Sequence, residues 1–212
     1  MEGQNDSKII AAWTVSFGTI IASLGLSPVI NGKTLTQDDS EDFAQGDVIE
    51  RDFLAIGNAL QALGNFKEAE MEEKYNLKKI GEEFQTAGNM TVLMALYLDL
   101  IESEDLPFLM DAQGNLLQGF GAFLGGINEI EEGNHLGFAG SILQVLGNLL
   151  QTLGDIFLFQ KWDTQPRRII YLGSWIQALG AYLSALDVTF DERNKEKEIL
   201  YGKKPVKGIF SF

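Results

Sequence analysis

The sequence has no cysteine, a single histidine and only four prolines in 212 residues. The lack of cysteine excludes disulfide-rich folds and zinc-finger classes. The single histidine, His135, leaves too few imidazoles for most metal centres and for most catalytic mechanisms that depend on histidine. Sites of these kinds are therefore not expected.

Basic residues are also scarce, with 16 Lys and Arg against 30 Asp and Glu, and the net charge is -14. Proteins bind nucleic acids by neutralising phosphates with Lys and Arg, so we expect no nucleic-acid partner. Aromatic residues make up 10 % of the chain and the mean hydropathy is +0.01, which excludes a disordered acidic chain.

Glycine is abundant, with 23 residues, about 11 % against a usual 7 %. Many glycines belong to a recurring phrase, Gly-x-x-Φ-Gln-x-Φ-Gly, in which Φ is apolar. A degenerate copy runs from Gly18 to Gly25 and has Ala22 in place of the glutamine. These matches are too many for chance and identify an internal repeat. The full copies begin at Gly57, Gly81, Gly114, Gly140, Gly147 and Gly173.

The spacing of the copies predicts the fold. Leaving out the tandem copy at Gly147, successive copies start 24, 33, 26 and 33 residues apart, so every second step is close to 58 residues. A unit of about 58 residues holds two helices, which is an αα-hairpin. We therefore predict an all-α fold: an antiparallel bundle of about six helices built from duplicated hairpins, without a substantial sheet.

Caps and helix breakers place the boundaries, with Pro107 in a short loop and a break at Gly133 and Asn134. We predict helices at about 8–26, 47–75, 77–103, 112–131, 136–161 and 166–199. We expect a single helical domain over 1–212. Its parts are an N-terminal helix plus acidic connector (1–45), a first hairpin (46–113), a second hairpin (114–172), and the last helix with a basic tail (173–212).

The glycines and the glutamine of one phrase share a helix face, because seven residues at about 100° each return to within about 20° of the start. Glycine inside a helix costs up to about 1 kcal/mol relative to alanine, so the many glycines need compensation. We expect close approach of helix backbones, with glutamine hydrogen bonds across the seam. The alternative is that glycines accumulated in copies under weak selection.

The same geometry places the apolar fourth and seventh positions on the adjoining flank, which we expect to face the core. The second positions, which include Asn58 and Glu82, are then on a wetter side. Helices 47–75 and 77–103 carry most of the acid and should lie further out. Six side chains are expected to be nearly inaccessible, with Gln118, Gln144, Gln151 and Gln177 lining their contacts: Leu117, Leu143, Leu146, Leu150, Ile176 and Leu179.

Motifs that resemble known sites fail in their sequence context. Glu132 and His135 have the Glu-x-x-His spacing of di-iron bundles, but such sites need a second histidine, and Gly133 interrupts the helix. The segment 27–34 resembles a phosphate-binding loop but follows an apolar helix instead of a strand. The Gly-x-Gly at 119–121 lies inside a helical phrase. We predict no catalytic, cofactor-binding or metal-binding residues.

Two acidic clusters, at 68–73 and 129–132, lack the ligand order and glycine of a calcium loop, so we interpret them as solvated faces. The segment 89–91 matches a glycosylation acceptor, but it lies in the middle of a helix and no signal peptide is in view. We expect neither calcium binding nor glycosylation.

Three stretches without charge approach bilayer-spanning length: 22 residues at 9–30 and 18 each at 136–153 and 169–186. Glycine at close contacts is also typical of helices that pack in lipid. However, each stretch carries Gln, Asn or Ser, and dense acids flank the helices 47–75 and 77–103, which we expect not to span. We predict a cytoplasmic protein, with membrane association as the alternative.

The recurring phrase resembles that of uncharacterised "repetitive" helical proteins of spore-forming, low-GC Gram-positive bacteria, over about residues 50–186. The resemblance implies no activity, cofactor or catalytic residue. The leading hypothesis is a non-enzymatic helical scaffold or interaction protein that binds a protein partner, or itself, through its Gly/Gln helix faces. The alternative is a membrane-active protein, holin-like or pore-forming, that inserts its uncharged Gly-rich helices.

Overall fold

The computed structural model describes residues 2–28, 44–101, 105–162 and 165–201. These residues form α-helices and contain no strand, which confirms the all-α prediction. Each of the six predicted helices is present. The helices are α1 (Glu2–Gly25), α3 (Ala44–Met71), α4 (Leu77–Ile101), α5 (Leu106–Glu131), α6 (His135–Phe159) and α7 (Pro166–Tyr201).

Two helix ends show how local sequence sets the boundaries. Helix α5 begins earlier than predicted because Pro107 lies in its first turn, where the missing N–H has no helical partner and the fixed φ already fits. Gly133, with φ 74°, follows α5, and the side chain of Asn134 accepts from the Gly137 N–H and caps α6. The predicted break at 133–134 is therefore confirmed. Residues 29–34 of the phosphate-loop resemblance, most of the acidic connector and the tail 203–212 lie outside the described residues.

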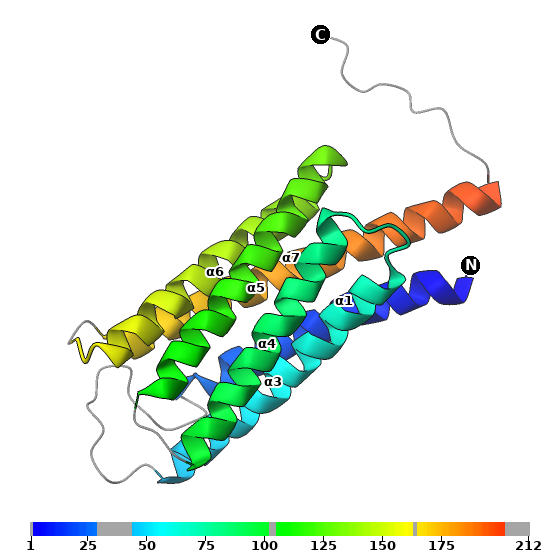
Figure 1. Ribbon diagram of the computed structural model, residues 1–212. Coiled ribbons are helices and arrows are strands. Elements are labelled where there is room, and N and C mark those ends of the chain that lie inside the picture. The colour runs from blue at the N-terminus through cyan, green and yellow to red at the C-terminus, as the bar shows by residue number, and fades with distance from the viewer. Residues whose placement is uncertain (1, 29–43, 102–104, 163–164, 202–212) are drawn as a thin grey trace.

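The six helices form a closed ring. Within the described residues each helix packs against two neighbours only, in the order α1, α3, α4, α5, α6, α7 and back to α1. Neighbours run antiparallel, so the start of α1 and the end of α7 lie at the same end of the bundle (Figure 1). We call this the terminal end and the other the opposite end. Helices α3 and α4 are full members of the ring, so the expectation that they lie further out is wrong.

Glycine seams hold three of the neighbouring pairs at backbone contact. A Cβ on Gly18 would lie 2.6 Å from the carbonyl oxygen of Gly57, which joins α1 to α3. Equivalent contacts join α4 to α5 and α6 to α7, where a Cβ on Gly147 would lie 2.6 Å from the Gly173 oxygen. Close approach therefore accounts for the glycines, and drift under weak selection does not. The seams thus join α1 to α3, α4 to α5 and α6 to α7. The predicted hairpins 46–113 and 114–172 instead pair α3 with α4 and α5 with α6.

The interior of the ring is polar, and the predicted core is wrong. Leu146 is 49 % exposed and Leu179 is 51 % exposed, while the other four predicted core residues are half-buried. The second positions of the phrase, which include Asn58 and Glu82, are buried instead of wet. The reason is that the Gly/Gln face turns inward, where close backbones leave space only for small or hydrogen-bonded side chains. The buried apolar residues are Ala11, Ala12, Val15, Ala22, Ala62, Ala69, Val92, Ala95, Ala112, Ala122, Ala178, Ala181 and Ala185.

Candidate functional site

Four glutamines form a hydrogen-bonded group across the ring, which we call the glutamine girdle. Gln177 of α7 donates from Nε2 to Oε1 of Gln118 on α5 (2.9 Å) and to Oε1 of Gln61 on α3 (3.3 Å). Gln151 of α6 donates from Nε2 to Oε1 of Gln177 (2.9 Å). Helix α7 does not pack against α3 or α5, so two of these bonds cross the axis. The expected glutamine–glutamine bonds between helices are confirmed.

Toward the opposite end, polar side chains of α5 and α6 continue the interior. Asn115 donates from Nδ2 to Oδ2 of Asp155 (2.9 Å), and both residues are buried. Thr152 donates its hydroxyl to the Asn148 carbonyl oxygen (2.9 Å). The Oδ1 atom of Asp111 is buried and has no hydrogen-bond partner among the described residues. Polar groups therefore continue beyond the girdle toward the opposite end.

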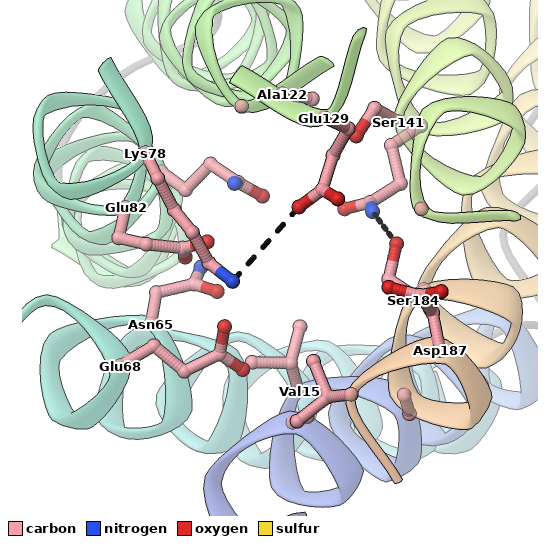
Figure 2. A pocket seen from close by; sticks show the side chains of 18 residues that line it. Val15, Asn65, Glu68, Lys78, Glu82, Ala122, Glu129, Ser141, Ser184 and Asp187 are labelled. Atoms are coloured by element: carbon pink, nitrogen blue, oxygen red, sulfur yellow. Dashed lines mark hydrogen bonds and ion pairs between the residues drawn. The ribbon is translucent and has the colours of Figure 1, made fainter. Parts of the chain in front are cut away.

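Toward the terminal end the axis widens into a cavity of about 50 Å³, which we call the terminal cavity. Side chains from all six helices line it, and Figure 2 shows them converging on a common centre. A water molecule needs about 10–15 Å³ of such space, so the cavity has room for a few waters. Pockets for organic ligands are roughly 300–1,000 Å³ in size, so a molecule of that class does not fit.

Charged groups line the terminal cavity on the side of α3, α4 and α5. Lys78 extends from α4 toward α5, with Nζ 3.9 Å from Oε1 of Glu129 (Figure 2). The carboxyl groups of Glu68 on α3 and Glu82 on α4 line the same side of the cavity as Lys78. On this side of the cavity three carboxyl groups, one from each helix, therefore face one ammonium group.

Hydrogen bonds fix the rim of the cavity on the α5, α6 and α7 side. Gln144 of α6 donates from Nε2 to the Ser184 hydroxyl of α7 (3.1 Å; Figure 2). The amide of Asn134, just before α6, donates to carboxylate oxygens of Glu129 and Asp187. One amide thus ties the end of α5 to α7, which positions Glu129 beside Lys78.

Part of the acidic clusters was misread from the sequence. Glu70, Glu73 and Glu131 are exposed as expected, but Glu129 is only 9 % exposed and Glu68 lines the cavity, so their assignment to solvated faces is wrong. Helical spacing carried the missing signal. Glu68 follows Gln61 by seven residues, which places it on the same inward face.

The remaining sequence motifs lie away from this cavity. His135 is exposed at the start of α6, and Glu132 is exposed and accepts from the Asn128 amide. No group of three or more metal-ligating side chains occurs in the part of the chain that the structure describes. Asn89 is fully buried and donates to the Gln85 carbonyl oxygen, so it is not accessible to a glycosylating enzyme.

The outer surface of the ring carries large apolar side chains on every helix, which we call the apolar belt. Three helical segments, Asn5–Gly25, His135–Phe159 and Pro166–Glu198, are long and apolar enough to cross a membrane. The belt is not confined to them. One representative from each helix, all between 48 % and 56 % exposed, is Phe17, Leu63, Met90, Phe120, Leu146 and Leu179.

Comparison with known proteins identifies a family. The model of a family of unknown function (DUF6944) matches residues 6–185, which include all of the glycine phrases. No curated protein and no solved structure matches the chain.

Proposed function

The chain belongs to this family of unknown function (DUF6944), and we propose that it is a non-enzymatic integral membrane protein whose six-helix ring lies in a lipid bilayer. The observation that carries the proposal is the inverted polarity of the ring. Amides, hydroxyls and carboxyls are buried, whereas Leu, Phe and Met side chains are exposed around the whole circumference. The proposal favours the membrane alternative over a cytoplasmic scaffold.

Water is a poor solvent for such a surface. The largest apolar patch on a typical soluble monomer is about 300–600 Å² and covers one side, whereas this belt includes all six helices. A lipid environment removes the unfavourable free energy of exposing this apolar surface to water. It also removes the hydrophobic drive between helices, so that close packing of small residues and hydrogen bonds must hold them together. The glycine seams and the glutamine girdle supply these two interactions.

The acids of α3 and α4 are compatible with this location. Glu68 and Glu82 line the interior, and the outward charges Asp52 and Lys67 of α3 lie on either side of its apolar stretch. That stretch, residues 53–66, is about 21 Å long at 1.5 Å per residue, shorter than the roughly 30 Å of a bilayer core. Local thinning of the bilayer and extension of charged ends into the headgroups accommodate such a difference. In this proposal α3 and α4 also span the bilayer, although the sequence analysis predicts that they do not.

Basic residues give the ring an orientation. In the described residues four Lys and Arg lie toward the opposite end and eight toward the terminal end, and positive charge favours the cytoplasmic side. The proposal therefore places both ends of the ring sequence in the cytoplasm. The eight are Lys8, Lys67, Lys74, Lys78, Lys79, Arg193, Lys195 and Lys197, and the four are Arg51, Lys161, Arg167 and Arg168.

Membrane fractionation tests the proposal. The full chain is expressed, membranes are washed with alkaline sodium carbonate, and the protein is followed in pellet and supernatant. Retention in the washed pellet and release by detergent are expected. Recovery in the aqueous supernatant before or after the wash would overturn the membrane location and restore the scaffold hypothesis.

The lack of native cysteine allows a clean test of orientation. Lys74→Cys lies between α3 and α4 at the terminal end, and Lys161→Cys lies after α6 at the opposite end; both positions are exposed. A membrane-impermeant maleimide applied to intact cells should label only Lys161→Cys. Labelling of Lys74→Cys alone would reverse the orientation, and the unsubstituted chain is the control.

A further inference from the structure

We propose that the axis of the ring is a pathway for small inorganic cations, entered through the terminal cavity and held closed by the glutamine girdle. The inference rests on the proposed membrane location. It adds a transported class and names the residues that close the path.

The arrangement of the six helices leaves the central axis of the ring free of backbone. In the described residues the helix backbones approach only those of their ring neighbours, so the centre is occupied by side chains and not by a helix. Polar side chains follow one another along the axis among small apolar ones: charged groups and Ser184 at the terminal cavity, then the girdle, then Asn115 and Asp155 beyond it. Ionisable and polar side chains inside a membrane bundle typically mark the route of an ion.

Size and charge select the class of solute. The terminal cavity holds about 50 Å³, which admits a few waters or one inorganic ion and excludes organic substrates. Four carboxyl groups line it, from Glu68, Glu82, Glu129 and Asp187, against one ammonium group, from Lys78. An excess of carboxylate favours a cation over an anion in a space of low dielectric constant.

The cavity departs from the repeat that builds the rest of the ring. Lys78 and Glu82 flank the first glycine of the α4 phrase, whereas Gly137 and Ser141 stand at the same two positions of the α6 phrase. The small residues leave space for the cavity and the charged ones face it. A Cβ on Gly125 would meet nothing within 4 Å, so this glycine also leaves space open. Repetition alone therefore does not generate this cavity.

The girdle closes the axis where the repeat is most regular. Gln177 bonds to three other glutamines and so joins α3, α5, α6 and α7 across the centre. Its removal takes away the side chain that donates both of the bonds across the axis. The expected consequence of Gln177→Ala is an open path between the terminal cavity and the polar groups of the opposite end.

Ion flux from vesicles measures this path. The full chain is reconstituted into phospholipid vesicles loaded with sodium chloride, a protonophore is added so that proton influx balances the charge of sodium efflux, and sodium and chloride efflux are followed separately with ion-sensitive dyes. We expect slow sodium efflux with the unsubstituted protein and about tenfold faster efflux with Gln177→Ala, since weakening the closed state by about 1.4 kcal/mol converts to that factor. Chloride efflux should not change. Leu179→Ala, on the apolar belt of the same helix, is the matched control and should behave as the unsubstituted protein.

A second pair of variants tests the role of the carboxyl groups and guards against misfolding. Glu129→Gln in the Gln177→Ala background should lower the sodium-to-chloride ratio of efflux. Gln61→Ala removes only the longest girdle bond and should also raise sodium efflux. This variant therefore tests the pathway even if Gln177→Ala does not fold. Circular dichroism of the reconstituted samples identifies the folded variants.

The outcomes separate the two proposals. Carbonate-resistant, helical Gln61→Ala and Gln177→Ala with sodium efflux no faster than protein-free vesicles would overturn the pathway but leave the membrane location intact. Equal acceleration of sodium and chloride would overturn cation selectivity. Extraction of the unsubstituted protein by carbonate would overturn the membrane location itself.

Discussion

The inside and the outside of the ring have exchanged the polarities that they have in a water-soluble bundle. Inside, among the residues that the structure describes, the largest fully buried side chains are Asn89 and Asn148, and no buried apolar residue is larger than valine. Outside, Phe17, Met90 and Leu179 are about half exposed. In soluble proteins Leu, Ile, Phe and Met are among the most buried residues and Asn and Gln are mostly exposed. This difference is the one that the proposed membrane location predicts, with lipid around the outside and polar side chains on the inside.

The two surfaces also differ in how closely they must fit. The inside depends on backbone contact at glycines and on amide hydrogen bonds, both of which tolerate little change. In the proposed membrane location the outside only has to be apolar, since lipid chains adapt to its shape. Substitutions should therefore separate the two regions by the size and the kind of their effect.

The largest effect is expected at a glycine seam. In Gly147→Leu the new side chain would start 2.5 Å from the Gln177 backbone nitrogen and 2.6 Å from the Gly173 oxygen, so α6 and α7 must separate. Overpacking costs about 1–3 kcal/mol and more when backbone atoms cannot yield, so we expect loss of stability at or above about 3 kcal/mol. Thermal unfolding in detergent micelles, followed by circular dichroism, measures it.

The matched control is Gly125→Ala, a helical glycine beside open space. Alanine is favoured over glycine in helices by about 0.5–1 kcal/mol, so this variant should be neutral or more stable. A higher melting temperature for Gly147→Leu would remove the close-contact explanation of the repeat.

A charge on the belt should act on location and leave packing unchanged. Leu146 lies near the middle of the uncharged stretch of α6, and a lysine there costs about 2.5–3.5 kcal/mol when the helix inserts into a membrane. Leu146→Lys should therefore reduce the carbonate-resistant fraction. Leu146→Phe keeps the surface apolar and is the control. Unchanged membrane retention of the lysine variant would show that this face does not meet lipid.

Helix positions could be predicted from the sequence because glycine spacing, caps and breakers are local signals. The direction in which each helix faces could not. A helix with glycine and glutamine on one side and leucine on the other is amphipathic in either solvent, and the pattern alone does not say which side is buried. Leu146 and Leu179 were placed in the core by the rule for water, and the structure places them on the outer surface.

The candidate site was only partly accessible to sequence reasoning. The glutamine girdle was predictable, since Gln118, Gln151 and Gln177 occupy the same position of a repeated phrase. The terminal cavity was not, because Glu68 comes from α3, Glu82 from α4 and Glu129 from α5, and ring closure alone brings them together. Glu68 and Glu129 each lie in a run of acidic residues, and a run of this kind resembles a solvated surface when the closure of the ring is not known.

A smaller effect is expected from removing a polar contact inside the ring. Gln177→Leu leaves Gln61 and Gln118 without their donor and Gln151 without one acceptor. Interhelical hydrogen bonds in membrane proteins average about 0.6 kcal/mol, so the three together predict a loss of about 2 kcal/mol. Unfolding in micelles measures the loss, and Leu179→Gln, on the outside, should cost less. Equal losses at both positions would erase the distinction between inside and outside.

The smallest effect distinguishes two sectors of the belt itself. On α3 and α4 the outward charges Asp52, Lys67, Glu83 and Asp99 limit the apolar stretches to 53–66 and 84–98, about 21–23 Å. On α6 no outward charge interrupts the surface from 136 to 159, about 36 Å, because Asp155 is buried. Hydrophobic mismatch costs fractions of a kcal/mol per Å, so thick bilayers should penalise the α3–α4 sector alone.

The thickness dependence can be measured with the unsubstituted chain. The protein is reconstituted into lipids of short and of long acyl chains, and its melting temperature is compared by circular dichroism. We expect a modestly lower melting temperature in the thick bilayer, corresponding to about 1 kcal/mol, because Asp52 and Lys67 must approach the hydrocarbon there. Lys67→Leu lengthens the apolar stretch of α3 and should reduce the difference between the two lipids. A melting temperature that is the same in both lipids would mean that α3 and α4 do not face acyl chains, and the apolar surface of that sector would then need another cover, such as a second copy of the chain.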